Sequence, residues 1–370
     1  MKLTIDRNAL MRALSHVQAV VERRNTIPIL SNILMVAEGD RLSLTATDLD
    51  IEATDAAEAS VKKAGSVTAP AQTLFDVVRK LPEGSEIALD LSESRLSISS
   101  GRSKFALPTL PASDFQTMAK EAAPVKFEMD AAELRRLIDK TRFAISTEET
   151  RYYLNGIYLH HAKGAKGSVL RAVATDGHRL ALAETEAPKG SATLKGVIVP
   201  RKAVAEARRL LDDAPELVTI EASDSKIVFR IGEAVLTSKL IDGSFPDYQR
   251  VIPKENGRIL VVENKPFKDA VDRVATVSAE RSRSVKLTLS PGKLTLAVSN
   301  AETGSGAEEL EVEYDAEPME IGFNAKYLLD VASQIEADET RIEFNDAASP
   351  ARVLDSKDDG AQYVLMPLRV

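Results

Sequence analysis

The chain has 370 residues, a formal net charge of -8 and no cysteine, which excludes disulfides, thiolate nucleophiles and cysteine-rich zinc sites. No apolar run approaches the ~18 residues that a membrane helix needs, and Asp6 and Arg7 interrupt the segment where a signal peptide would be apolar. We therefore expect a cytoplasmic, nucleoid-associated protein. The histidine pair at 160–161 would point to opposite faces of a strand, so we expect no metal site and no cofactor.

Three segments of the chain begin alike. LTIDRNALMRALSHV starts at residue 3, FEMDAAELRRLIDKT at 127 and LVVENKPFKDAVDRV at 260. Each predicts a short strand, then an acidic residue suited to the start of a helix, then apolar residues at helical spacing. The acidic residues are Asp6, Asp130 and Glu263.

The similarity continues through each copy. Strand–turn–strand stretches are predicted at 42–53, 170–183 and 294–307, and short polar residues that close turns lie at their centres. These residues are Thr47-Asp48, Thr175-Asp176 and Ser299-Asn300. Second helices are predicted from Pro70, Pro200 and Asn324, each followed by hairpins. GAKGS (164–168) and GSG (304–306) lack phosphate-loop spacing and are predicted to be turns.

This order of elements predicts an α+β fold of three repeated domains, each with two helices packed on antiparallel sheets. We expect the domains to span 1–120, 125–253 and 258–370, because proline, glycine and charged residues between these ranges are typical of linkers.

Positive charge is concentrated on the predicted helices. Five of the six helical windows carry net positive charge, and only 324–339 is net negative, although the whole chain is acidic. Basic helices on an acidic body favour a polyanion bound along one surface. For a single helix, a solvated basic face is the simpler interpretation. The densest points are Arg23-Arg24, Arg135-Arg136, Arg201-Lys202 and Arg208-Arg209.

The size of the repeat bears on the kind of polyanion. A domain of ~120 residues has a radius of gyration of about 13.5 Å, so six such domains in a closed ring would leave a hole of about 17 Å radius. Three domains would leave a hole too small for a duplex of about 10 Å radius. Two chains joined head to tail could therefore encircle double-stranded DNA without reading its sequence.

The stretch ATDGHRLALAE (174–184) suggests two alternatives. Asp176 and His178 could act as an acid–base pair in a hydrolase, but the sequence offers no accompanying nucleophile or orienting group. Thr-Asp recurs in the first copy, which indicates turn chemistry. Only the second copy has Gly177-His178-Arg179-Leu180, and a single-copy feature favours a binding site in which His178 and Arg179 supply donors.

The whole chain resembles the DNA polymerase III beta subunit family, the bacterial sliding clamps. The resemblance depends on eight blocks in order: PILSNILM (28–35), SGRSKFALPTLPASDF (100–115), RYYLNGIYL (151–159), ATDGHRLA (174–181), VIVPRK (197–202), TSKLIDGSFPDYQRVIP (237–253), MEIGFNAKYLLDV (319–331) and YVLMPLRV (363–370). It implies a non-enzymatic homodimeric ring of clamp domains on DNA. It also implies as partners the polymerase III alpha subunit, the clamp loader, and other polymerases and repair proteins that dock through short peptides.

The resemblance also implies site residues. The peptide pocket would contain Leu154, Thr175, Gly177, His178, Arg179, Leu180, Pro246, Arg250, Val251, Val364, Leu365, Met366, Pro367, Leu368 and Arg369. DNA contacts would include Arg24, Tyr152 and Tyr153, with Gln72 and Glu148 at neighbouring positions where some relatives have arginine and glutamine. The charge pattern adds Arg135, Arg136, Arg201 and Lys202.

Two of these assignments have simpler alternatives. Arg151-Tyr152-Tyr153 could be ordinary strand aromatics instead of a platform for unpaired bases. The tail YVLMPLRV could be a core strand; Pro367 cannot donate to a sheet, so we expect the strand to end there and leave 368–370 at an accessible edge. A protein-docking scaffold that does not encircle DNA also remains an alternative.

Overall fold

The computed structural model describes residues 1–22, 26–119, 121–278 and 283–369. The chain divides into two compact units. Unit 1 comprises Met1–Arg135, Pro188–Leu194 and Lys202–Leu240, and unit 2 comprises Arg136–Ala187, Lys195–Arg201 and Ile241–Val370. The central copy of the repeat thus contributes to both units. Among the described helices, none is long and apolar enough to cross a membrane.

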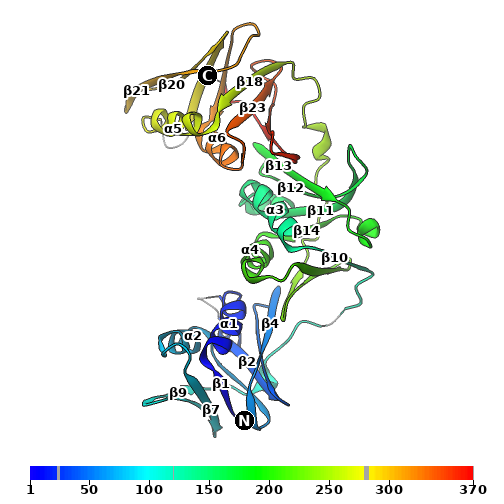
Figure 1. Ribbon diagram of the computed structural model, residues 1–370, viewed down its shortest axis with the longest axis vertical. Helices are drawn as coiled ribbons and strands as arrows, with labels where there is room; N and C mark the ends of the chain where they lie inside the picture. Colours follow the sequence, from blue (N-terminus) through cyan, green and yellow to red (C-terminus); the bar gives the residue numbers. More distant parts are fainter. Residues whose placement is uncertain (23–25, 120, 279–282, 370) are drawn as a thin grey trace. The chain divides into compact units, whose positions relative to one another are not determined.

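The repeat predicted from the sequence is present in all three copies (Figure 1). The first copy consists of β1 (Lys2–Asp6), α1 (Arg7–Gln18), β2 (Asn32–Glu38), β3 (Arg41–Thr47), β4 (Ile51–Glu58), β5 (Ser60–Lys63), β6 (Gly65–Pro70), α2 (Ala71–Lys80), β7 (Glu86–Ser92), β8 (Arg95–Ser100) and β9 (Ser103–Pro108).

The other two copies follow the same order without an equivalent of β5. The second consists of β10 (Val125–Asp130), α3 (Ala131–Thr141), β11 (Gly156–Lys163), β12 (Ser168–Thr175), β13 (Arg179–Glu186), β14 (Val197–Pro200), α4 (Arg201–Leu210), β15 (Leu217–Ala222), β16 (Lys226–Ile231) and β17 (Ala234–Lys239). The third consists of β18 (Arg258–Glu263), α5 (Asn264–Ala275), β19 (Ser284–Ser290), β20 (Lys293–Asn300), β21 (Gly304–Glu311), β22 (Met319–Asn324), α6 (Ala325–Ala332), β23 (Glu339–Phe344), β24 (Ala351–Asp355) and β25 (Asp358–Leu365).

The sheets are antiparallel, and two of them join neighbouring copies. Unit 1 contains the sheet β5-β1-β7-β8-β9 and the sheet β10-β15-β16-β17-β4-β3-β2-β6, in which β17 of the second copy pairs with β4 of the first. Unit 2 contains the sheet β14-β11-β12-β13-β25-β24-β23-β18, in which β13 pairs with β25 of the third copy, and the sheet β21-β20-β19-β22. The predicted α+β class is confirmed.

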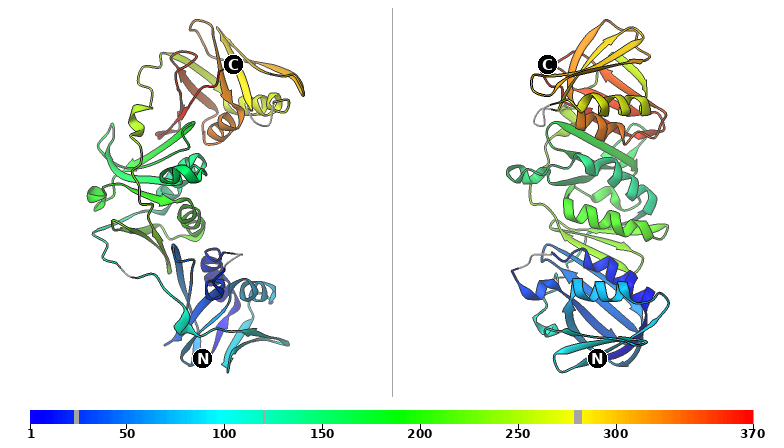
Figure 2. Two further views of the ribbon diagram at one scale, coloured as in Figure 1. Left: turned by 180° about the vertical axis from the view of Figure 1, so that it is seen from behind. Right: turned by 90° about the vertical axis from the view of Figure 1, so that its left-hand side faces the viewer.

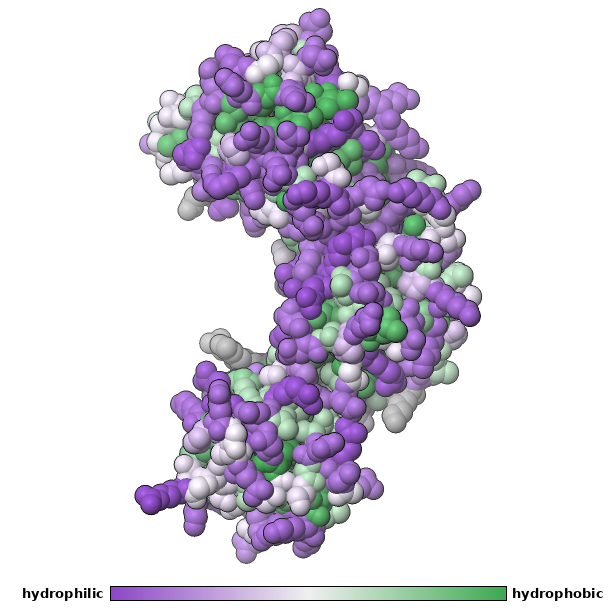
Figure 3. Space-filling model, viewed as in Figure 1, coloured by the Kyte–Doolittle hydropathy of each residue, from purple (hydrophilic) through white to green (hydrophobic). Residues whose placement is uncertain are grey.

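The helices pack on the sheets through the apolar positions seen in the sequence. Leu10, Leu14 and Val17 of α1 are fully buried, and α1 lies beside α2 (Figure 2). In the third copy, α5 lies beside α6 and buries Phe267 and Val271 (Figure 2). Each such side chain contributes roughly 1.5–3 kcal/mol through its burial. Charged and polar side chains dominate the surface in the view of Figure 3, with apolar patches between them.

The helix starts agree with the sequence in two copies. The Asp6 carboxylate accepts from the backbone N–H groups of Asn8 and Ala9, and Asp130 accepts from Ala132 at 2.7 Å. Glu263 makes no side-chain capping bond, because its longer side chain is less suited to fold back on the first turn.

Two local predictions were wrong. Residues 304–306 (GSG) form the start of β21 and not a turn, since the ladder from β20 extends to Gly304. The last strand, β25, ends at Leu365, before Pro367, as predicted. Leu368, however, is not left at an open edge: its N–H donates to the carbonyl of Gly322 at 2.8 Å, and its side chain is half-buried.

Candidate functional site

The turn between β12 and β13 is held by its own threonine and aspartate. The Thr175 hydroxyl donates to the Arg179 carbonyl at 2.7 Å and accepts from the Gly177 N–H. Asp176 Oδ1 accepts from the N–H groups of His178 and Arg179. Both side chains are therefore used to close the turn.

The first copy closes the turn between β3 and β4 in the same way. The Thr47 hydroxyl donates to the Ile51 carbonyl and accepts from the Leu49 N–H, while Asp48 Oδ1 accepts from Asp50 and Ile51. The shared bonding pattern explains why Thr-Asp recurs. Asp176 thus belongs to the fold: its two carboxylate oxygens bond to the N–H groups of the turn and to the Arg179 side chain.

Arg179 is a buried structural cation. Its side chain is 7% exposed and pairs with Asp176 at 3.1 Å and with Asp330 of α6. Its Nη2 donates to the Phe143 carbonyl at 2.7 Å, and the guanidinium lies over the rings of Phe143 and Tyr327. All three guanidinium nitrogens have partners within unit 2, so Arg179 positions the turn; that it also supplies donors to a ligand stays a prediction.

Beside this turn lies a cavity of about 280 Å³. It is bounded by the β12–β13 turn, the segment before β11, the segment after β17 and the end of β25. Its lining residues are Arg151, Tyr153, Leu154, Thr175, Gly177, Arg179, Leu180, Pro246, Asp247, Tyr248, Val251, Val364 and Met366. All of them belong to unit 2. A mostly apolar hollow with a few polar groups at its rim suits an apolar peptide or a small ligand.

The structure brings together nine of the predicted pocket residues: Leu154, Thr175, Gly177, Arg179, Leu180, Pro246, Val251, Val364 and Met366. Six others do not line the cavity: His178, Arg250, Leu365, Pro367, Leu368 and Arg369. Leu365 is buried on the opposite face of β25, as strand alternation requires. The exposed Arg250 pairs with Asp247 at 2.8 Å, and the His178 ring stacks on Tyr327.

Four lining residues were not assigned to the pocket from the sequence. They are Arg151 and Tyr153, which the sequence associates only with DNA, and Asp247 and Tyr248. Tyr248 is 5% exposed and packs in a cluster with Val173, Leu180, Leu182 and Val364. The aromatic pair Phe245 and Tyr248, three residues apart in the loop after β17, is a signal that could have identified it.

The segment before β11 carries the aromatic pair predicted to meet DNA. Tyr152 is 53% exposed and packs edge-on against Tyr153, their centroids 5.8 Å apart. Glu148 forms a bidentate ion pair with Arg151, at 2.7 and 2.8 Å, which lowers the pKa of Glu148 and raises that of Arg151. A role for Glu148 in holding Arg151 at the pocket accounts for a carboxylate at this position.

The predicted basic DNA contacts fall into different environments. Lys202 pairs with Asp48 and Glu22, and Arg136 binds both oxygens of Asp358 at 2.9 Å. Arg135 donates to the Leu211 carbonyl. The helix charges are thus partly neutralised by acidic neighbours that a count along the sequence does not reveal. Arg201 and Gln72 are exposed, and Arg24 lies outside the described residues.

Comparison with known proteins finds similarity along the whole chain. Family models of the DNA polymerase III beta subunit match its N-terminal domain at residues 1–119, its central domain at 128–247 and its C-terminal domain at 249–369. The beta sliding clamp of Caulobacter vibrioides is 59% identical and that of Pseudomonas putida 40% identical, each with 100% of both chains covered.

Solved structures of sliding clamps are similar to the chain along its whole length. A sliding clamp from Bartonella birtlesii bound to griselimycin is 50% identical with a TM-score of 0.97, and 100% of both chains is covered. A clamp from Caulobacter crescentus with polyethylene glycol at its putative motif-tethering region is 59% identical with a TM-score of 0.97, and the match covers 100% of this chain and 99% of that one.

Three repeated α+β copies with these matches define a sliding-clamp protein. The chain belongs to the DNA polymerase III beta subunit family, the bacterial beta sliding clamps. Its function is that of a DNA sliding clamp, and this family comprises non-catalytic processivity factors.

Proposed function

We propose that two copies of the chain close head to tail into a ring around duplex DNA, and that the ring tethers polymerases by their peptides. The observation that carries this proposal is a pair of sheet edges. Among the described residues, β9 at the end of one sheet and β21 at the end of another each have a strand neighbour on one side only. Such edges favour pairing with another strand.

The repeat indicates which edges belong together. Strand β9 is the last strand of the first copy, as β17 and β25 are of the second and third. Strand β21 is the third strand after the first α-helix of its copy, as β4 and β13 are in theirs. Inside the chain β17 pairs with β4 and β25 with β13, so by equivalence β9 of one chain would pair with β21 of another.

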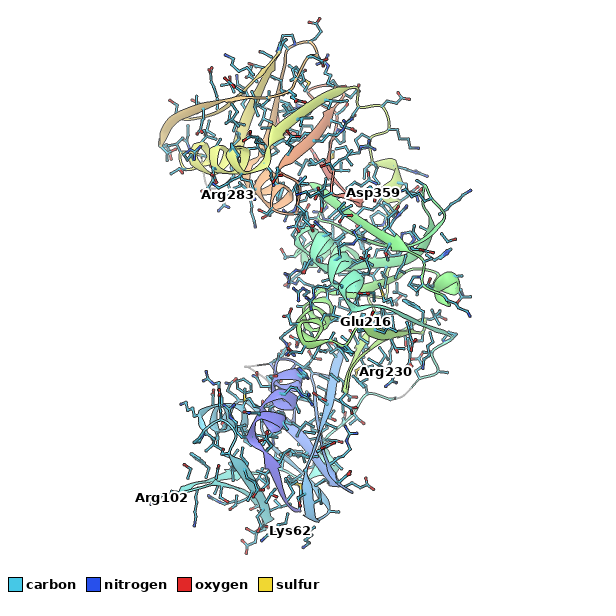
Figure 4. All side chains as sticks on the ribbon, in the orientation of Figure 1. Lys62, Arg102, Glu216, Arg230, Arg283 and Asp359 are labelled. Carbon is cyan, nitrogen blue, oxygen red and sulfur yellow. The ribbon has the colours of Figure 1, made fainter. Side chains whose placement is uncertain are left out.

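The two edges also differ in charge. Arg102 points outward at the turn before β9 (Figure 4), Lys104 follows it, and Phe105 is 41% exposed. Strand β21 presents the acidic Glu309 and Glu311 at the surface. Opposite charges around an apolar contact favour this pairing over β9 with β9 or β21 with β21.

For the ring interior we propose contacts that need no sequence readout. Arg24, Arg201, Tyr152 and Tyr153 are the first candidates, since Arg135, Arg136 and Lys202 already have protein partners. Gln72 is a weaker candidate because it bonds to Gln18 and Asp76. Basic side chains would meet phosphates, and the exposed tyrosine pair could stack on unpaired bases. The basic helices then supply a sliding surface and no chemical step, so we propose that the protein has no catalytic residue.

We propose domain limits of 1–120, 125–253 and 258–370; the three family models match residues 1–119, 128–247 and 249–369. At the boundary near residue 250 the cavity of unit 2 would receive short apolar peptides of the polymerase III alpha subunit, the clamp loader and repair proteins. We also propose that it receives griselimycin, which is bound by the clamp of Bartonella birtlesii.

The test uses topology. The protein is loaded by its clamp loader onto a nicked circular plasmid, and half of the sample is then cut once with a restriction enzyme. A ring stays on the circle and slides off the cut DNA, so retention should fall on cutting. Equal retention on both would contradict encirclement, and failure to bind any DNA while griselimycin still binds would leave only a docking scaffold.

A further inference from the structure

A buried polar network lies behind the docking cavity. The Arg171 Nη1 on β12 donates to the Tyr248 hydroxyl at 2.9 Å, and His160 Nε2 on β11 lies 3.0 Å from the same hydroxyl. His160 Nδ1 lies 3.0 Å from the carbonyl of His161. His160 and Arg171 are directly opposite in the β11–β12 ladder, and His160 does not line the cavity.

The donors and acceptors fix the protons of this network. Arginine can only donate, so the Tyr248 oxygen accepts from Arg171 and directs its own proton elsewhere. His160 Nε2 is the acceptor in reach, which requires it to be unprotonated. Nδ1 then carries the proton and donates to the carbonyl of His161. Every proton of this network has an acceptor only when His160 is neutral.

A proton on Nε2 would disrupt the arrangement. The Tyr248 oxygen would then face two donors, and its own proton would lose its acceptor in a buried site. The groups facing His160 are Arg171, His161, Tyr158 stacked at 4.6 Å, and Tyr248; Glu184 pairs with Arg171 at 2.5 Å. Burial lowers the pKa of His160; the bond to the His161 carbonyl raises it, whereas Arg171 and the His161 ring lower it.

Tyr248 connects this network to the cavity. Its ring lines the cavity and packs on Leu180 and Val364, two other lining residues. It also begins the short 3₁₀ turn Tyr248–Arg250, in the segment that carries the lining residues Pro246 and Val251. The position of the Tyr248 hydroxyl therefore sets the position of the segment that forms one wall of the cavity.

We infer that His160 is a positioning residue for docking: in its neutral form it accepts the Tyr248 hydroxyl proton and holds the 245–252 segment against the cavity, so that protonation of His160 weakens binding of a ligand there. This inference rests on the proposed docking function. It identifies a residue outside the cavity that makes docking depend on pH.

The probe is griselimycin, with its dissociation constant measured by calorimetry between pH 8 and pH 5.5 on the full-length protein. For the unmodified chain we expect affinity to fall only at the acid end of this range, because burial lowers the pKa of His160, and by up to about ten-fold where His160 is fully protonated, since one buried hydrogen bond is then lost. His160→Gln offers an amide oxygen that can accept from Tyr248 but does not titrate, so it should bind well at pH 8 and lose most of the pH dependence. His160→Leu cannot accept and should bind about ten-fold more weakly throughout.

His161→Gln is the neighbour control, because its side chain points to the other face of β11. Since the His161 ring lowers the pKa of His160, this variant should move the pH response of binding upward but leave its size unchanged. Nitrogen chemical shifts of the imidazole should report protonated Nδ1 and unprotonated Nε2 in His160 without any ligand, and circular dichroism should establish that each variant is folded.

Four results are decisive. Full pH dependence in His160→Gln would assign the titration to another group and overturn the inference. So would unaltered affinity in His160→Leu at pH 8. If the unmodified chain fails to bind griselimycin even at pH 8, the docking proposal itself fails, whereas binding that does not change with pH overturns only the role of His160.

Discussion

Leu49 and Gly177 occupy the same position in two repeated turns, and both have a positive backbone φ, 76° and 88°. The turn therefore imposes this conformation whichever residue is present, and the first copy tolerates leucine there. Glycine at 177 adopts this conformation without strain, and it also leaves room for a side chain that lines the cavity. A Cβ atom at this position would lie 2.5 Å from Nη1 of Arg151, which lines the cavity.

Gly177→Ala should consequently affect both stability and docking. The positive φ costs an L-residue about 1–2 kcal/mol, and Arg151 must move away from the new methyl group. We expect a lower urea midpoint and weaker griselimycin binding. Gly232→Ala is the control, since its φ is +60° but the nearest atom lies 3.8 Å away. If both variants change griselimycin binding equally, the position of Arg151 does not affect binding.

Arg179 and Arg250 should differ in their importance for stability. Arg179→Ala leaves the carboxylates of Asp176 and Asp330 without their buried partner, and a loss of about 3–5 kcal/mol is typical of such a change. Arg250→Ala removes an exposed pair and should hardly change stability. Urea denaturation followed by circular dichroism measures both. A stable Arg179→Ala variant would contradict the structural role given to this arginine.

The proposed ring interface can be tested at one aromatic residue. Phe105→Asp places a charge at the exposed edge of β9 and should change the native mass from that of two chains to that of one. Leu217 on β15 is 56% exposed, more than the 41% of Phe105, but lies within a sheet and not at its edge. Leu217→Asp should remain a dimer by native mass spectrometry, and a dimeric Phe105→Asp would count against the β9–β21 pairing.

Glu52 makes the stability of unit 1 depend on pH. Burial raises the pKa of its carboxyl, although the bond from the Met118 N–H at 2.7 Å and the charge of Lys226 oppose the shift. The folded chain thus binds this proton more readily than the unfolded chain. The resulting stabilisation is present at low pH and is lost as the pH rises through the folded-state pKa.

Glu52→Gln should therefore raise the melting temperature at pH 7 relative to the unmodified chain, and the gain should shrink toward pH 4. Melting curves between these values, with the exposed Glu58→Gln on the same strand as control, provide the measurement. A gain of the same size at every pH would argue against titration of Glu52.

Much of the fold could be predicted because it depends on local, repeated signals. The strand–helix openings, the Thr-Asp turns and the second helices recur at equivalent positions, and agreement between copies strengthens each prediction. The GSG stretch misled because glycine and serine are typical of turns, whereas here the ladder with β20 overrides that preference.

The site was less predictable because its side chains are engaged by residues distant in the sequence. Nothing near Arg179 indicates Asp330, and nothing near Arg136 indicates Asp358. The same holds for Tyr248, whose importance depends on a histidine 88 residues away. The sequence identifies the charged groups, but only the folded structure shows which of them are already neutralised by an ion pair.

The edges β9 and β21 have a further consequence. A head-to-tail contact between unlike surfaces has no inherent end: it closes only if the successive rotations add to a full turn, and otherwise it continues as a filament. A substitution that altered the path of the chain between copies, far from either edge, could leave both edges intact and still convert a discrete assembly into an open polymer. Electron microscopy of linker variants would then reveal fibres, although every strand pairing was preserved.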